Sequence, residues 1–501
     1  MRAPAHARRT LVQNAFRTNS DNLSLRVVHG ASFAVAGIAV RVGITLVSMA
    51  VLARLLTPAD FGHVVMANVV TELAVVFSSF GLGQIIIQRK RLARLQIDTI
   101  WWATLALGIL LTTVVAGISF LVSVFFFIPL AGELLRVLCL TFVLDQLTVV
   151  PNSLLSRTLM FRQLFGVQVA TLLFRAGSAI VLAIWGAGVW SLVWAAVAAS
   201  AVQLVICTFL AGFRPRMRFS SAFLKSTLRT TGSYFASGIM FYANTNLDLA
   251  IVGRSLGATA LGFYQAARGL ADDISARIAV PLQRVLMPAF ATVQDDLARF
   301  RFGVMRSGRL LALVTIPVGF GVASVADELI PILYGVQWLP MIPLLKILAP
   351  AAGLRAATTI SQSVFQAANR VDISMRLNLV WITIMLALLV LVRSYGLYGF
   401  ATIYALNAAF ALIVLGVSLR LANIARREMG GMLMPPIAAA LVMMGAVYSM
   451  RALLEGMILS EFMRFFVLVA SGVVTYCCGI LLMARQHCRD IRDVISLFRK
   501  K

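Results

Sequence analysis

The sequence VLARLLTPADFG at residues 51–62 is matched 200 residues later by IVGRSLGATALG at residues 251–262. The offset aligns three identical pairs and, further on, two acids: Arg54 with Arg254, Leu56 with Leu256, Gly62 with Gly262, and Glu72 with Asp272. Each copy lies where one apolar run ends and the next begins. A repeat of this kind within a membrane protein predicts a chain built from two related halves.

The composition around this repeat is that of a membrane protein. Sixty per cent of the 501 residues are hydrophobic, whereas soluble domains contain about 45–50%. A membrane-spanning helix needs about 20 apolar residues, and the apolar runs of this chain provide roughly fourteen. Each should be helical, because an isolated strand leaves its backbone unsatisfied in lipid. We therefore predict an all-α, polytopic membrane protein, and exclude a soluble domain, a disordered chain and a disulfide scaffold.

The spacing of the apolar runs predicts two pseudo-symmetric six-helix bundles and two further C-terminal helices. The expected parts are a cytoplasmic tail at 1–26, the first bundle at 27–211, a basic linker at 212–229, the second bundle at 230–421, helices 13 and 14 at 434–484, and a basic tail at 485–501.

The net charge of +25 comes from 44 Lys and Arg against 19 Asp and Glu. With the predicted helices and a cytoplasmic N-terminus, 30 of these cations fall on the cytoplasmic side and five on the opposite side. This asymmetry follows the positive-inside rule and predicts that both termini are cytoplasmic. The basic tail at 485–501 is expected to bind anionic lipid headgroups, and no nucleic-acid partner is expected.

Charges inside the predicted spans carry more information about function than the total does. Nine are cations and five are acids: Arg41, Arg136, Arg175, Arg268, Arg277, Arg284, Arg309, Lys346 and Arg355, with Glu72, Asp145, Asp248, Asp272 and Asp273. Arg136, Arg309 and Lys346 lie near span ends and can reach the membrane surface. The other six cations are expected to face the protein interior or a water-filled cavity, because charges at membrane depth are costly.

The eighth span, near 260–290, holds two pairs at the i, i+4 spacing of an ion pair on a helix. Arg268 and Asp272 form one pair, and Asp273 and Arg277 form the other. Arg268 and Arg277 are nine residues apart, which is about two and a half helical turns, so the two pairs lie on opposite faces of the helix. This helix is therefore either surrounded by polar contacts or broken, and its two prolines, Pro281 and Pro288, permit a break.

Three stretches in this order resemble a known family: VLARLLTPADFGHVVMA at 51–67, NLDLAIVGRSLGATALGFYQAAR at 246–268 and VLMPAFATVQDDLARFR at 285–301. They are similar to the polysaccharide transporter (Wzx-type) branch of the multidrug/oligosaccharidyl-lipid/polysaccharide exporter superfamily. The resemblance implies two six-helix bundles around a central cavity, lined chiefly by spans 1, 2, 7 and 8.

The resemblance also implies a function in the bacterial inner membrane. A polyprenyl-pyrophosphate-linked oligosaccharide would pass from the cytoplasmic to the periplasmic leaflet by alternating access, for exopolysaccharide, capsule or O-antigen synthesis. The resemblance suggests these partners: the lipid-linked substrate, membrane lipids, a polysaccharide polymerase, and chain-length or export proteins.

Arginine suits such a substrate, because its planar fork stays charged and can bind phosphate oxygens in pairs. Arg41, Arg268, Arg277 and Arg284 lie on spans 1 and 8 and are the main candidates for substrate contact; Arg175 and Arg355 are further candidates. Intramembrane ion pairing is the alternative for each. Glu72, Asp248 and Asp272 could either couple an ion gradient to transport or form ion pairs that hold the bundles together.

The sequence favours a transporter over an enzyme. The predicted extramembrane segments are too short for a catalytic domain, the four histidines are scattered, and neither a metal site nor a cofactor is expected. Two alternatives remain: a cation-coupled multidrug exporter of the same superfamily and a membrane-embedded polysaccharide polymerase. The excess of intramembrane cations over acids favours an anionic substrate over a cationic drug.

Overall fold

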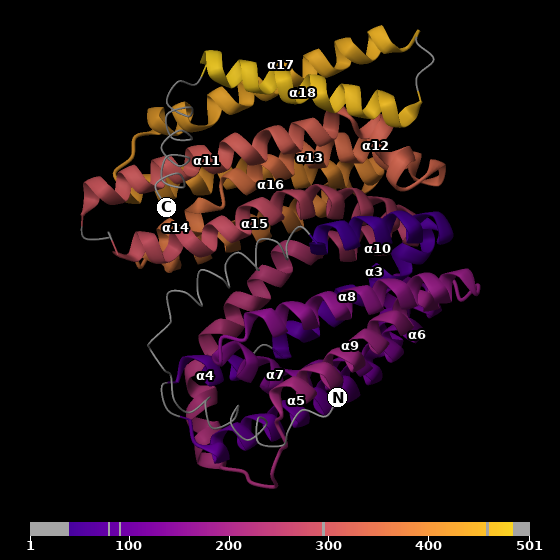
Figure 1. The fold of residues 1–501 in the computed structure, drawn as a ribbon, viewed down its shortest axis with the longest axis vertical. Coiled ribbons are helices and arrows are strands. Elements are labelled where there is room, and N and C mark those ends of the chain that lie inside the picture. Colours follow the sequence, from indigo (N-terminus) through magenta and orange to yellow (C-terminus); the bar gives the residue numbers. More distant parts are fainter. Residues whose placement is uncertain (1–39, 79–80, 90–91, 293–295, 457–459, 484–501) are drawn as a thin grey trace. The chain divides into compact units, whose positions relative to one another are not determined.

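The computed structural model describes residues 40–78, 81–89, 92–292, 296–456 and 460–483, and over these residues the chain forms helices and no strand (Figure 1). Eleven described helices or helix pairs are long and apolar enough to cross a membrane. The other three predicted spans coincide with a helix at 40–55 and with the two parts of α10. The all-α, polytopic prediction is confirmed, and a total of about fourteen spans is consistent with it.

The helices belong to two compact units, Met1–Gly262 and Phe263–Lys501. The first unit contains the helix at 40–55 and α3 (Pro58–Ser78), α4 (Leu82–Gln88), α5 (Arg94–Phe126), α6 (Pro129–Leu138), α7 (Leu140–Arg157), α8 (Phe161–Ile184) and α9 (Trp190–Ala211). The predicted second span, near 62–87, is thus divided between α3 and α4. The fourth is divided between α6 and α7.

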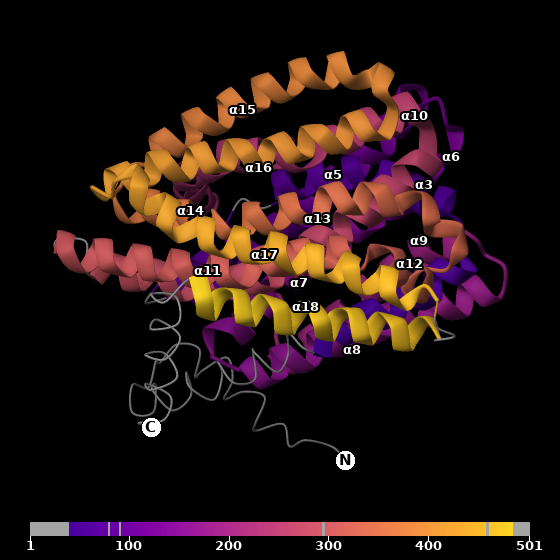
Figure 2. The same ribbon diagram turned by 90° about the horizontal axis from the view of Figure 1, so that it is seen from above.

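The second unit contains α11 (Leu297–Ser324), α12 (Ala326–Leu333), η1 (Val336–Met341), α13 (Ile342–Ala357), α14 (Ile360–Ala367), α15 (Val371–Leu391), η2 (Val392–Tyr395), α16 (Gly396–Leu421), α17 (Arg426–Leu454) and α18 (Glu461–Met483). In Figure 2, α15 runs beside α16 and α17 runs beside α18, and each pair is in contact.

A long helical stretch, α10 (Ser221–Thr292), contains the predicted seventh and eighth spans. Its helical geometry is interrupted at Gly257, which has φ +82°. Glycine adopts this conformation without the steric cost that a side chain brings. The chain then remains helical to Thr292, through Pro281 and Pro288, so the break in the eighth span that these prolines permit is not present.

The same order of helix contacts occurs in both halves, as the sequence repeat predicts. In the first half, α5 packs against α7, α7 against α9 and α8 against α9. In the second, α11 packs against α13, α13 against α16 and α15 against α16. In each half, the third span therefore packs against the fourth, the fourth against the sixth, and the fifth against the sixth. The internal repeat is therefore structural as well as sequential.

The two repeated segments cross each other within the first unit at their matched glycines. A Cβ atom added to Gly62 would lie 1.8 Å from the carbonyl oxygen of Ala258, and one added to Gly262 would lie 1.9 Å from that of Pro58. The two contacts are equivalent under the 200-residue offset, so the crossing is self-complementary. Glycine is required at both positions because only a hydrogen atom fits between the two backbones.

Helices α17 and α18 form an additional pair that is held to the rest of the second unit by ion pairs. Arg451, near the end of α17, has its Nη2 2.7 Å from Glu328 Oε2 and donates another hydrogen bond to the Ser324 carbonyl. Its Nη1 lies 2.5 Å from Asp327 Oδ2, which Lys346 also contacts at 2.8 Å. Lys346 is therefore neutralised by a neighbouring carboxylate as well as lying near a span end.

Candidate functional site

One group of charged side chains in the described part of the second unit surrounds Asp272 of α10. Its Oδ2 atom lies 3.5 Å from Nε of Arg268, one helical turn earlier. Its Oδ1 atom accepts hydrogen bonds from the guanidinium of Arg355 on α13 and from the hydroxyl of Tyr404 on α16. We call these four residues, from three helices, the Asp272 cluster.

Both arginines of the Asp272 cluster also lie against the ring of Tyr404. The guanidinium carbon of Arg355 is 4.8 Å from the ring centroid, and that of Arg268 is 5.6 Å from it. These distances permit cation–π attraction. Arg268 and Tyr404 are buried, whereas the Arg355 and Asp272 side chains remain 28% and 25% exposed. Two members of the cluster are therefore buried, and the other two are partly exposed.

The Asp272 cluster carries a surplus of positive charge. It holds two guanidinium groups and one carboxylate, and both carboxylate oxygens already have partners. A guanidinium has five N–H donors, and the ion pair of Arg355 with Asp272 involves one of its nitrogens. Such a group attracts an anion more strongly than it would in water, since the surroundings have a low dielectric constant. Phosphate oxygens match this geometry and charge.

The position of Arg355 is set by the close packing of α13 on α11. A Cβ atom on Gly319 of α11 would lie 2.4 Å from the Ala349 carbonyl oxygen, and one on Gly353 of α13 would lie 2.6 Å from that of Thr315. The two backbones are thus in direct contact two residues before Arg355. Small residues at helix interfaces give this close approach in membrane proteins.

The polar side chains of the first unit are more dispersed. Arg41, at the start of the described helix 40–55, donates a hydrogen bond from Nη1 to Oε1 of Gln168 on α8, 3.0 Å away. Seven residues further along α8, Arg175 lies on the same face and interacts electrostatically with Asp145 of α7. Asp145 is in turn hydrogen bonded to Ser200 of α9.

The structure thus brings together some of the predicted site residues and separates others. Arg268, Asp272 and Arg355 are in contact in the second unit, while Arg41 and Arg175 are associated with α8 in the first. Glu72 is exposed on α3, and Asp248 is buried on α10 with a partner. The side chains of Arg277 and Arg284 lie outside the described residues.

Tyr404 and Gln168, which contact the predicted site arginines directly, were not predicted from the sequence. The prediction rested on formal charges, and neither residue carries one. Their position within apolar runs could have identified them, since a polar group at membrane depth needs a partner. Among the described residues, no three His, Cys, Asp or Glu side chains gather in a way that could hold a metal ion.

Comparisons with known proteins agree with one another. The model of a family described as polysaccharide biosynthesis protein matches residues 51–343. The lipopolysaccharide biosynthesis protein WzxC of Escherichia coli (strain K12) is 29% identical over 363 residues, which are 71% of this chain and 73% of WzxC. The succinoglycan biosynthesis transport protein ExoT of Rhizobium meliloti (strain 1021) is 25% identical over 62% of this chain and 63% of ExoT.

Among solved structures, the lipid II flippase MurJ in an inward closed conformation has a similar fold, with a TM-score of 0.74. The alignment covers 91% of this chain and 99% of MurJ, at 14% sequence identity. At this identity, the likeness concerns the fold alone.

Proposed function

Because the chain belongs to the polysaccharide biosynthesis protein family, we propose that it is a flippase for a lipid-linked oligosaccharide. Its substrate is a polyprenyl-pyrophosphate-linked repeat unit, which it moves by alternating access from the cytoplasmic to the periplasmic leaflet of a bacterial inner membrane. The repeat units then serve the synthesis of a surface polysaccharide. The names of the relatives support this proposal, since they refer to lipopolysaccharide biosynthesis and succinoglycan transport.

The observation that carries the proposal is the surplus cation of the Asp272 cluster. A lipid-linked sugar can leave its tail in the bilayer, but its pyrophosphate must cross about 30 Å of hydrocarbon. Arg355 and Arg268 provide guanidinium groups at membrane depth, and Asp272 and Tyr404 hold them in place. A cationic drug would be repelled by this arrangement, which argues against the multidrug exporter alternative.

Other residues have supporting roles in this proposal. Arg41 and Arg175, together with Arg277 and Arg284, supply further cations along the path of the pyrophosphate. Glu72 and Asp248 remain candidates for ion coupling or for ion pairs within the protein. Both termini face the cytoplasm, and a polysaccharide polymerase and export proteins receive the translocated product.

Deletion of the gene and complementation with variants test this function. The deletion should abolish the surface polysaccharide while lipid-linked repeat units accumulate on the cytoplasmic face. Complementation with Arg355→Gln should lower export by roughly tenfold or more, because charged hydrogen bonds to the phosphate are lost. Arg355→Lys should restore part of it. Arg299→Gln is the matched control, because Arg299 is 79% exposed and pairs with Asp296 at the start of α11.

Two outcomes contradict the proposal. Accumulation of repeat units on the periplasmic face indicates a polymerase. Sensitivity to cationic drugs with normal polysaccharide indicates a multidrug exporter. The protein level in the membrane must be measured for each variant, so that a loss of export is separated from a loss of protein.

A further inference from the structure

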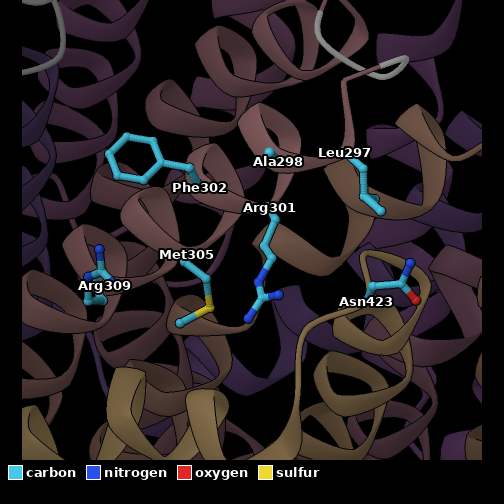
Figure 3. Close-up of a pocket in the computed structure, with 7 residues that line it drawn as sticks. All are labelled: Leu297, Ala298, Arg301, Phe302, Met305, Arg309 and Asn423. Atoms are coloured by element: carbon cyan, nitrogen blue, oxygen red, sulfur yellow. The ribbon is translucent and has the colours of Figure 1, made fainter.

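A second basic region of the second unit lies apart from the Asp272 cluster. It is a pocket of about 600 Å³ between the first turns of α11 and the connection from α16 to α17. Figure 3 shows Arg301 in the middle of the pocket, Arg309 beyond Met305 on one side, and Asn423 on the other. Along α16, Tyr404 of the Asp272 cluster is 16 residues, or about 24 Å, from Arg420 at the end nearest this pocket.

The pocket lies in a concentration of positive charge. Residues 296–309 and 420–428 together contain seven arginines and two acids. One of the acids, Glu428 on α17, forms an ion pair with Arg301. Arg309 lies eight residues further along the same helix, about 12 Å deeper. The pocket therefore presents guanidinium groups at two depths near one end of the helix bundle.

The rest of the pocket wall is apolar. Phe302 and Leu297 are 58% and 49% exposed, and Met305 is buried below them. Phe302 also has the guanidinium of Arg306 5.9 Å from its ring centroid. The surface at this end of α11 is therefore amphipathic, because exposed aromatic and aliphatic side chains lie next to arginines.

We propose that this pocket binds an anionic glycerophospholipid of the surrounding bilayer. The lipid phosphate contacts Arg301 and Arg309, and the upper part of an acyl chain lies along Phe302 and Leu297. Basic pockets between membrane helices recognise such headgroups by charge, and arginine can bind two phosphate oxygens at once. The lipid would strengthen the contact between α11 and α17 that the ion pair of Arg301 with Glu428 already makes. This binding goes beyond the proposed transport function and does not depend on it.

Native mass spectrometry and thermal unfolding of the purified full chain in neutral detergent test the proposal. Phosphatidylglycerol should remain bound and raise the unfolding temperature, whereas phosphatidylcholine should do neither. Arg309→Gln should weaken phosphatidylglycerol binding roughly tenfold, because one charged hydrogen-bonding group is lost. It leaves the pair of Arg301 with Glu428 intact, so it is the safer variant for folding. Arg301→Gln should have an effect of similar size.

Arg299→Gln provides the matched control, since Arg299 lies on the same helix but does not line the pocket. Its binding of phosphatidylglycerol should equal that of the unchanged protein. The proposal is overturned if phosphatidylcholine binds as tightly as phosphatidylglycerol. It is also overturned if the Arg309→Gln and Arg301→Gln variants bind phosphatidylglycerol as tightly as the unchanged protein does. Displacement of the lipid by millimolar inorganic phosphate would assign the pocket to a free anion. Displacement by a far lower concentration of polyprenyl pyrophosphate would assign it to the transport substrate instead.

Discussion

Glu72 and Asp272 occupy the same position in the two copies of the repeat, yet their surroundings are opposite. Glu72 is exposed on α3, whereas Asp272 accepts contacts from two arginines and a tyrosine. One of those partners has no charged counterpart in the first half, since Asn68 stands at the position that aligns with Arg268. The repeat thus preserves the helix framework, while at this position the described residues of the second half form a charged cluster.

This difference separates two kinds of intramembrane acid. A carboxylate held by two cations fixes the positions of those cations, so its main contribution is structural and electrostatic. An exposed carboxylate makes no such demand on its neighbours. Substitutions at the two acids, at the crossing glycines and at Tyr404 should therefore have effects on stability of decreasing size.

Replacement of Asp272 by asparagine should destabilise the protein by about 3 kcal/mol, because two guanidinium groups would lose the charge between them. The partial exposure of Asp272 places this value at the lower end for a buried ion pair. Glu72→Gln is the matched control and should change stability by no more than about 0.5 kcal/mol. Thermal unfolding in detergent and the amount of protein in the membrane measure both. Similar effects of the two substitutions would remove the distinction between the acids.

The second prediction concerns the crossing of Gly62 and Gly262, where the two copies of the repeat make equivalent contacts. Gly62→Ala and Gly262→Ala should each destabilise by about 2 kcal/mol, since the added methyl group meets a backbone carbonyl that cannot move freely. Gly117→Ala, on α5, has nothing within 4 Å of its added Cβ atom. It should be neutral or stabilise by up to about 1 kcal/mol, because alanine favours a helix. A large effect at one crossing glycine alone would show that the crossing is not symmetric.

The third prediction tests the partner of Asp272 that carries no charge. Tyr404→Phe keeps the ring beside both arginines and removes the hydroxyl, so it should cost about 1.5 kcal/mol, as expected for a hydrogen bond to a charged group. Tyr398→Phe on the same helix, where the side chain is 55% exposed, should have little effect. Unfolding temperatures compare the two. Equal temperatures for both variants would mean that the hydroxyl does not help to hold Asp272.

The fold was largely predictable from the sequence, because apolar length and the 200-residue repeat determine how many helices form and how the halves correspond. The prediction failed in detail where a break depends on local geometry. Pro281 and Pro288 permit a break in the eighth span, but α10 continues through both, and its interruption at Gly257 lies between the predicted seventh and eighth spans. Helix divisions such as that of the second span between α3 and α4 were also missed.

The candidate site was predictable only in part. The spacing of Arg268 and Asp272 predicted their ion pair, because both residues lie on one helix. The contributions of Arg355 and Tyr404 come from helices far apart in the sequence, and spacing says nothing about such contacts. Charge alone therefore identified Arg355 as one of six candidates without indicating its partner, and it gave no reason to consider Tyr404.

The crossing of Gly62 and Gly262 has a consequence for the ancestry of the chain. Its paired contacts, each glycine against the backbone of the other segment, have the geometry of an isologous dimer interface, in which one surface patch meets its own copy. A half-length ancestor would need a single glycine to form both contacts. Once two copies are joined in one chain, each glycine can mutate separately, but the loss of either one spoils a contact that the other cannot replace.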